Sequence, residues 1–368
     1  MRVMTTSTDV GAGAGGDGSL EGSKGLGVAA RLAAVLAAGL LLRAMHPGQP
    51  IVENYVGRQI PTAMAARNLD RGSGFLRPRL DTEPAPNYFL VEPPIYQALV
   101  VGLRRVNGLP LDVCGRLTSA LAATLAAWGV YALVKRRAGE PAALAAAAAF
   151  SMLPITIRYG RAFQPDALMV GGCVAGLACW DAAVRGGGRS RRWLAAGWLL
   201  TAAGGAAKAT AAYIPLVAFL VLFPRRTWKS AVLCGTTILP VLAWYAWAAG
   251  LAASDGSRAS EANRDIWMSL LGLGALASAE TWGHIGRFLF LRAFTPLGLI
   301  AAAWGLRSPA VRGAGASIWW AWIGLATLVM ALLAGKLHHE YYWLCLAPPV
   351  AAGLGLAWAR IDALRPLA

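Results

Sequence analysis

Apolar residues along this chain are gathered into long runs that polar segments separate. A run of roughly 20 apolar residues can cross the hydrocarbon core of a bilayer as one helix, so we expect about ten membrane-spanning helices. They fall at residues 26–45, 113–134, 141–157, 167–184, 193–207, 209–223, 231–251, 288–306, 317–335 and 342–359. The pattern predicts an all-α polytopic membrane protein whose transmembrane part covers residues 26–359.

Two long polar segments, residues 46–112 and 254–287, interrupt the apolar pattern. Within the first, residues 62–69 and 95–106 have apolar side chains at helical spacing. This spacing predicts helices that lie in the plane of the membrane interface. A similar interfacial helix is expected at residues 266–276 of the second segment.

Both ends of the chain predict tails outside the membrane. Residues 1–25 are rich in Gly, Ser and Thr, which predicts disorder, and residues 360–368 form a short second tail. The first apolar run is either a cleaved signal peptide or an uncleaved anchor. Because the segment before it is long and hardly basic, and no small-residue cleavage site is evident before Arg43, we interpret it as an anchor.

Composition and charge support this topology. Of the 368 residues, 57% are hydrophobic and only 14% are charged, whereas soluble domains carry about 25% charged residues. The net charge of +16 has no accompanying nucleic-acid motif, and the basic residues recur in alternate loops, represented by Arg136, Arg191, Arg226 and Arg312. Since basic loops face the cytoplasm, we expect both tails on the cytoplasmic side of the cell membrane. Both long polar segments are expected on the extracytoplasmic side.

The predicted outer face carries charged residues beside the spans. Lys208 and Lys336 adjoin apolar runs in a chain where lysine is rare, and an ionisable group at membrane depth is a functional candidate. Glu53 and Asp166 also adjoin spans, where a partly desolvated carboxylate can act as a general base. The alternatives are an ordinary solvated loop acid at Glu53 and an acid that favours the helix dipole at Asp166.

The sequence His338-His339-Glu340 raises the question of a metal site. Adjacent side chains on a helix point to different faces, and no second metal-ligand pattern accompanies these residues. We therefore predict no metal ligands and no cofactor, without excluding a divalent ion.

The order of several short motifs resembles the GT-C type of integral-membrane glycosyltransferases, most of all the protein O-mannosyltransferase and aminoarabinose-transferase-like branch. The motifs that carry this resemblance are Glu53 with Arg58-Gln59, Val91-Glu92-Pro93-Pro94-Ile95-Tyr96, Gly115-Arg116-Leu117, Tyr159-Gly160-Arg161 with Pro165-Asp166, Ala207-Lys208, and Lys336 to Tyr342. Together they extend over most of the chain.

The resemblance implies transfer of a sugar from a polyprenyl-phosphate donor to an extracytoplasmic acceptor in a glycan, lipid or protein. It implies Glu53 and Asp166 as catalytic residues. The family usually has Asp near the end of the first span, whereas this chain has Glu53, so the base stays open between the two. The implied substrate-binding residues are Arg58, Gln59, Glu92, Tyr96, Arg158, Arg161, Lys208, Lys336, His339 and Tyr341.

Two other functions fit a polytopic protein with charges near the membrane. One is a transporter or flippase of a lipid-linked or anionic solute, although such proteins often show internal repeats that this sequence lacks. The other is a catalytically silent scaffold that binds lipid. Release of sugar from a labelled lipid donor separates the enzyme from both alternatives.

Overall fold

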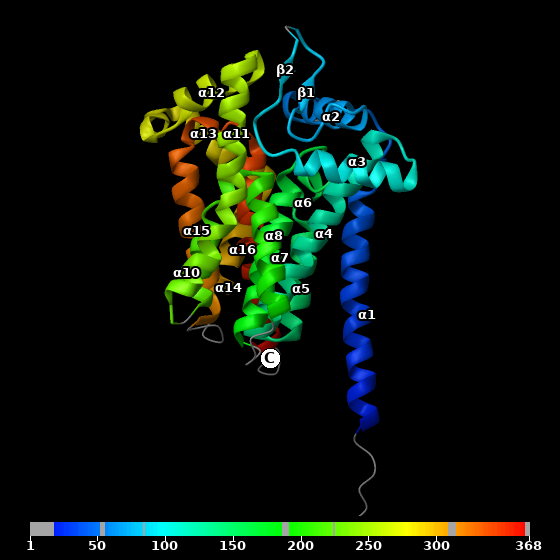
Figure 1. Cartoon of the computed structure of the whole chain (residues 1–368). Coiled ribbons are helices and arrows are strands. Elements are labelled where there is room, and N and C mark those ends of the chain that lie inside the picture. Colours follow the sequence, from blue (N-terminus) through cyan, green and yellow to red (C-terminus); the bar gives the residue numbers. More distant parts are fainter. Residues whose placement is uncertain are drawn as a thin grey trace, which may run out of the picture.

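The computed structural model describes residues 18–51, 56–83, 85–185, 191–223, 225–307 and 314–364. Within these ranges the regular structure is helical except for a two-stranded antiparallel hairpin of β1 (Arg79–Leu80) and β2 (Asn87–Tyr88). Figure 1 shows an upright bundle of helices with shorter elements across one end. We call this end, which carries residues 56–107 and 258–286, the loop end.

The predicted spans coincide with helical structure, and some are nearly unbroken. These are α1 (Gly18–Arg43), α4 (Leu111–Ala138), α7 (Asp166–Arg185), α8 (Arg191–Ala207) and α15 (Ala314–Leu332). The helix α1 begins inside the tail predicted at residues 1–25, while residues 1–17 lie outside the described residues. The all-helical membrane fold predicted from the apolar runs is therefore confirmed.

The other predicted spans are divided into shorter helical pieces. The pieces are α5 (Glu140–Met152) and α6 (Pro154–Tyr159), then η1 (Ala209–Ala211), α9 (Ile214–Val217) and η2 (Ala218–Leu222), then α10 (Trp228–Gly235), η3 (Thr236–Ile238) and α11 (Leu239–Asp255), then η5 (Arg287–Ala293) and α14 (Pro296–Leu306), and finally η8 (Glu340–Leu346) and α16 (Ala347–Leu364). Proline lies in the first turn of α6, α9, α11 and α14. Because proline has no backbone N–H and fits the first turn, it starts a new helix at each point.

Length and apolarity identify four helical segments of the described chain that could cross a membrane, namely Leu111–Ala138, Asp166–Arg185, Trp228–Asp255 and Glu340–Asp362. The pair Ala279–Ala293 and Pro296–Leu306 is also apolar enough, but it bends by 82°. Shorter apolar helices lie at Ala209–Leu222 and Ser317–Leu332. The total of about ten spans stays a prediction.

The loop end has helical structure at each of the three places where an interfacial helix was expected, and one further helix, α13 (Ala279–Gly286). The elements at the expected places are α2 (Val56–Asp70), α3 (Ile95–Asn107), α12 (Arg258–Leu270) and η4 (Leu273–Ala277). The boundaries predicted for residues 266–276 were wrong, because Ser257 caps α12 by accepting a hydrogen bond from the Ser260 N–H. The helix ends before Gly272, whose φ of +120° suits glycine.

Small residues allow the bundle helices to pack closely. The helix α7 packs on both α4 and α8. A Cβ atom added at Gly171 would lie 2.4 Å from the Ala122 carbonyl oxygen, and one added at Gly204 would lie 2.9 Å from the Cys173 amide nitrogen. Such close backbone approach is the usual reason for small residues in membrane helices. It brings the first residue of α7 beside the end of α8.

The buried Arg43 joins α1 to the break between α5 and α6. Its guanidinium donates to the backbone carbonyls of Gly39, Ser151 and Thr156 and to the Thr156 hydroxyl. These acceptors include carbonyls that the break leaves without helical partners. The contact fixes α6 and the turn that follows it, which leads to Asp166.

Candidate functional site

Lys208 and Asp166 form a buried ion pair near the loop end. Lys208 follows α8 in extended conformation, and its Nζ lies 2.5 Å from Oδ1 of Asp166, the first residue of α7. Their side chains are 5% and 0% exposed. Within the described residues, the other carboxylate oxygen, Oδ2, has no hydrogen-bond partner. The ammonium group of Lys208 is thus shielded from solvent and held in place. The Oδ2 atom of Asp166 can still accept a hydrogen bond.

Two aromatic rings complete the surroundings of Lys208. Its Nζ lies 4.2 Å from the ring centroid of Tyr341 and 4.5 Å from that of Tyr342. Cation–π attraction strengthens when the cation is desolvated. Both tyrosines belong to η8, so this segment, the start of α7 and the end of α8 form one site.

A second ion pair lies nearby between Arg58 of α2 and Glu92, the residue that follows Val91 ahead of α3. Both side chains are mostly buried. The Arg58 guanidinium also lies 5.6 Å from the ring centroid of Phe89. Arg58 is therefore held at the loop end by a carboxylate and an aromatic ring.

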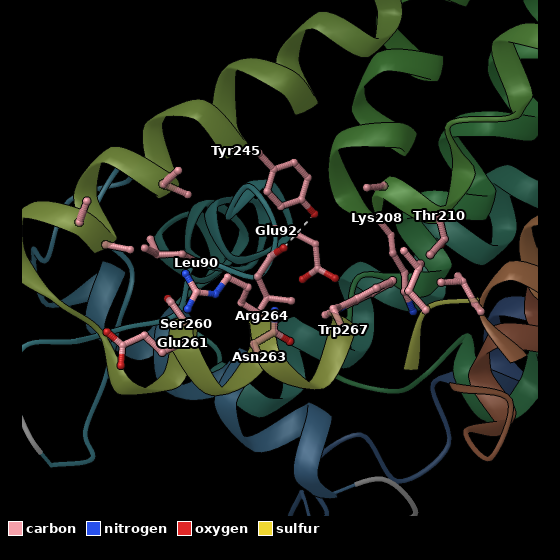
Figure 2. A pocket seen from close by; sticks show the side chains of 18 of the residues that line it. Leu90, Glu92, Lys208, Thr210, Tyr245, Ser260, Glu261, Asn263, Arg264 and Trp267 are labelled. Atoms are coloured by element: carbon pink, nitrogen blue, oxygen red, sulfur yellow. Dashed lines mark hydrogen bonds between the residues drawn. The ribbon is translucent and has the colours of Figure 1, made fainter. Parts of the chain in front are cut away.

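Lys208 and Glu92 both line a cavity of about 890 Å³. One wall is the alanine-rich face of α11, and another is α12, which contributes Ser260, Asn263 and Trp267. Figure 2 shows the Glu92 carboxylate and Trp267 directed into the space beside Lys208, with the Tyr245 hydroxyl donating to the Val91 carbonyl at 3.1 Å. The cavity is mostly apolar with a few charged and polar groups, which is the usual character of a ligand site.

Positive charge accumulates beside this cavity. Burial lowers the pKa of Lys336, and the neighbouring Arg58 and Lys208 lower it further. Burial also lowers the pKa of His339 to about 3, helped by His338, Lys336, Lys208 and Arg58. His339 is therefore neutral at pH 7 and stacks on Tyr341, with ring centroids 5.2 Å apart. An anionic ligand would relieve the repulsion among these cations.

The side chains of His338 and His339 lie against each other. The expectation that His338 and His339 point to different faces was wrong, since their ring centroids lie 3.9 Å apart. The reason is that His338 lies in a turn between η7 (Ala334–Lys336) and η8 rather than within a helix. Among the described residues, no group of three or more His, Cys, Asp or Glu side chains is arranged to hold a metal ion.

Four predicted binding residues contact the protein's own framework. Gln59 accepts a hydrogen bond from the Phe163 N–H at 2.8 Å, and the Tyr96 hydroxyl donates to the Gly115 carbonyl at 2.8 Å. Arg161 donates to the His46 carbonyl at 3.4 Å. Arg158 forms an ion pair with Glu340. The contacts of Gln59 and Arg161 brace the turn before α7, and that of Tyr96 joins α3 to α4.

Glu340 is a buried carboxylate that two arginines hold. Arg292 of η5 lies 3.1 Å from its Oε2, and Arg158 of α6 pairs with Oε1. Glu340 is 0% exposed and directly precedes Tyr341. These pairs anchor η8 and thereby place the tyrosine rings against Lys208.

The predicted base Glu53 lies outside the described residues. The chain just before it is held by the buried Arg116, whose Nη2 donates to the carbonyls of Gln49 and Pro50 at 3.1 and 3.2 Å. Arg116 belongs to one of the motifs that carried the family resemblance, so that motif contacts the segment leading to Glu53.

Several residues of the site were not predicted. Tyr342 stands next to the predicted Tyr341, and its place in the same motif could have revealed it. Arg292 lies near the start of an apolar run, which gave no reason to expect a site residue there. Trp267 lies in the segment that was predicted to be an interfacial helix. Tyr245 carried no distinguishing signal, since it lies within an apolar span.

Comparison with known proteins supports the family resemblance. Residues 91–247, less than half of the chain, match the family model described as dolichyl-phosphate-mannose-protein mannosyltransferase. This range includes Glu92, Asp166, Lys208 and Tyr245. A search of curated protein sequences gives no match.

Two solved structures are similar over nearly the whole chain. One is ArnT from Cupriavidus metallidurans bound to undecaprenyl phosphate, with a TM-score of 0.63 and 17% identity, covering 90% of this chain and 59% of that one. The other is the archaeal oligosaccharyltransferase AglB from Archaeoglobus fulgidus in complex with an inhibitory peptide and a dolichol-phosphate, with a TM-score of 0.56 and 13% identity, covering 94% of this chain and 51% of that one. The chain thus spans 59% and 51% of these two proteins.

The helical bundle and these likenesses define an integral-membrane protein of the GT-C fold. Within that class, the chain carries the sequence pattern of the dolichyl-phosphate-mannose-protein mannosyltransferase family in residues 91–247. The resemblance predicted from the order of its motifs is confirmed.

Proposed function

We propose that this protein transfers a sugar from a polyprenyl-phosphate donor to an acceptor hydroxyl on the extracytoplasmic side of the cell membrane. The observation that carries this proposal is the buried Lys208 ammonium, fixed by Asp166 and two tyrosine rings at the side of an 890 Å³ cavity. A lipid phosphate beside Lys208 would find a fixed cation in a site from which water is largely excluded.

In the proposed reaction the acceptor oxygen attacks the anomeric carbon of the donor. The bond between that carbon and the phosphate oxygen breaks, and its electron pair remains on the departing polyprenyl phosphate. The acceptor proton passes to a carboxylate. Lys208 stabilises the charge that grows on the phosphate, because a charge-assisted hydrogen bond from a preorganised donor is strongest in a dry site.

Arg58 and Lys336 extend the positive surroundings of the leaving group. Arg58, Lys208 and Lys336 are three cations, while Asp166 and Glu92 are two carboxylates paired with them. The group therefore carries one excess positive charge before the ligand arrives. An anionic phosphate would be attracted to this excess.

Glu53 is the proposed general base, and Asp166 is the proposed partner that positions Lys208. The reason is that Asp166 already accepts a hydrogen bond from an ammonium group. The Oδ1 atom of Asp166 is therefore engaged in positioning Lys208. Glu53 belongs to the motif in which the family usually has Asp.

Similar proteins and loop charges support the donor and the sidedness of the proposal. The ArnT structure contains undecaprenyl phosphate, and the AglB structure contains a dolichol-phosphate. The C-terminal ends of α4 and α7 and the start of α8 are rich in basic residues, namely Lys135, Arg136, Arg137, Arg185 and Arg191. These helix termini lie at the end of the bundle opposite to the loop end (Figure 1). By the positive-inside rule this end faces the cytoplasm, and the cavity opens on the other side.

The proposal is tested with the purified full chain in vesicles that contain polyprenyl phosphate linked to labelled mannose. We expect the label to leave the lipid and appear on an added glycan, lipid or peptide acceptor, or in water, with formation of polyprenyl phosphate. Movement of intact donor between leaflets without bond cleavage would instead indicate a flippase. Donor binding with neither movement nor cleavage would indicate a scaffold.

A further inference from the structure

Trp267 occupies a central place in the cavity. It belongs to α12, is half-buried, and lines the cavity together with Glu92 and Lys208. Figure 2 shows its ring extending from α12 towards Lys208, with the Glu92 carboxylate directed to the same space. The indole therefore lies where a group attached to a phosphate at Lys208 would arrive.

Lys336 lies against the indole of Trp267. Its Nζ is 4.9 Å from the ring centroid, and the residue is only 7% exposed. Among the described residues, no carboxylate oxygen lies within 4.0 Å of this ammonium group. The aromatic face of Trp267 therefore helps to offset the charge of Lys336, and a desolvated cation gains most from such contact.

The backbone fixes this pair. The Gly272 N–H donates to the Leu332 carbonyl at 2.8 Å, which joins the end of α12 to the end of α15. Gly335 packs so closely on Leu270 that a Cβ atom there would lie 2.9 Å from the Leu270 Cδ2. These contacts, which follow the tryptophan and precede the lysine in the chain, hold the two backbone segments close together.

The remaining cavity walls suit a sugar ring. A pyranose has an apolar C–H surface that stacks on a flat aromatic ring, and hydroxyl groups that need polar partners around its edge. Glu92, Ser260 and Asn263 line the same cavity as Trp267 and offer such partners. The alanine-rich face of α11 leaves the space between them open.

We propose that Trp267 is the platform on which the sugar ring of the donor stacks, and that Lys336 is the positioning residue that fixes this platform. The inference rests on the proposed function and assigns the sugar subsite within that cavity. It gives Lys336 a role through Trp267 in addition to the charge that it contributes near the lipid phosphate.

Two probes test the role of Trp267 in the purified full chain, namely polyprenyl phosphate and polyprenyl phosphate linked to mannose. Trp267→Ala should weaken binding of the mannose-bearing lipid roughly fivefold, because an aromatic contact contributes about 1 kcal/mol. Binding of the plain lipid should not change. Trp267→Phe should retain most of the affinity, whereas Trp267→Leu, which keeps apolar bulk without a flat face, should not. Trp228→Ala, at a 72% exposed position outside the cavity, is the matched control.

The same two probes separate the positioning role of Lys336 from direct phosphate contact. Lys336→Met should weaken binding of the mannose-bearing lipid more than binding of the plain lipid, which loses only the attraction of one nearby positive charge. Lys336→Arg should restore both affinities, since a cation again faces the indole. Equal weakening of both lipids in Lys336→Met would mean that Lys336 holds the phosphate, and would contradict the inference.

The outcomes also separate this inference from the proposed function. If wild-type protein binds and cleaves the mannose lipid but Trp267→Ala and Trp267→Leu bind both lipids normally, the sugar subsite is elsewhere and the transferase proposal stands. If wild-type protein binds neither lipid, both proposals are wrong. Thermal unfolding of each variant, compared with that of Trp267→Phe, shows whether lost binding comes from lost structure.

Discussion

The Lys208 ammonium lies 2.5 Å from the Asp166 carboxylate although 42 residues separate them in the chain. Taking two charges out of water is costly, and a buried ion pair often contributes little net stability. A contribution to stability alone therefore does not explain why these two charges are buried together. In the proposed function, the same desolvation makes Lys208 a strong partner for a lipid phosphate.

The first prediction concerns Lys208. Replacing it with Met removes a charge-assisted contact of about 1.5–3 kcal/mol, so affinity for polyprenyl phosphate should fall roughly 10- to 150-fold. Lys208→Arg should retain part of this affinity, because the positive charge remains. Direct lipid binding measures both effects. Lys229→Met is the matched control, since Lys229 is exposed and should leave binding unchanged; wild-type affinity in Lys208→Met would remove this residue from the site.

The second prediction concerns Glu53. Glu53→Gln keeps the size of the side chain but removes the proton acceptor, so sugar transfer should slow by roughly 10²–10⁴-fold. Donor binding should be nearly unchanged, and Glu53→Asp should keep part of the activity. Glu83→Gln is the matched control, because Glu83 is an exposed acid in the same polar segment. A Glu53→Gln protein that turns over normally would move the base to Asp166, which Asp166→Asn then tests.

The third prediction concerns the anchor of η8. Glu340→Gln replaces a buried carboxylate that two arginines contact, and the loss of these charged contacts should lower the unfolding free energy by roughly 1–3 kcal/mol. Sugar transfer should also decrease because Tyr341 and Tyr342 lose their support. Thermal unfolding and transfer rates measure the two effects. The exposed pair Arg67–Asp81 provides the comparison, since breaking it with Arg67→Gln should cost at most about 1 kcal/mol. Equal stability of the two variants would contradict the anchoring role.

The fourth prediction is a pH dependence of stability that depends on His339. Its pKa falls from an ordinary 6.5 to about 3 in the folded protein, so the unfolded chain binds a proton first as the pH decreases. Stability should therefore decline as the pH falls from about 6.5 towards 3, with no contribution from His339 above that window. His339→Asn should reduce the decline, whereas substitution of the exposed His46 should not. An unchanged pH profile in His339→Asn would contradict the burial of this imidazole.

The sequence predicted the fold well because apolar runs of membrane length have few alternatives. The positions of α4, α7, α8 and α15 follow directly from those runs. The divisions at Pro154, Pro215, Pro240 and Pro296 lie within or beside continuous apolar sequence, so hydropathy alone did not reveal them. The start of α12 was missed because a polar helix that begins with a serine cap has no apolar run to mark it.

The sequence predicted the members of the site better than their contacts. Lys208, Asp166 and Tyr341 each stood out locally, but their meeting depends on how α7 packs on α8 and on the fold of η8. The pairing of Arg158 with Glu340 joins residues 182 positions apart. Local spacing carries no information about such a contact. Substrate binding by Arg158, which the family resemblance implied, stays a prediction.

The central claim is that a polyprenyl phosphate binds with its head group beside Lys208, and an experimental structure of the complex tests it most directly. We expect a phosphate oxygen about 2.7–2.9 Å from the Lys208 Nζ, the distance of a charge-assisted hydrogen bond, with the head group in the cavity beside Glu92 and Trp267. A phosphate bound at the opposite end of the bundle, or at the loop end but out of contact with Lys208, would contradict the account.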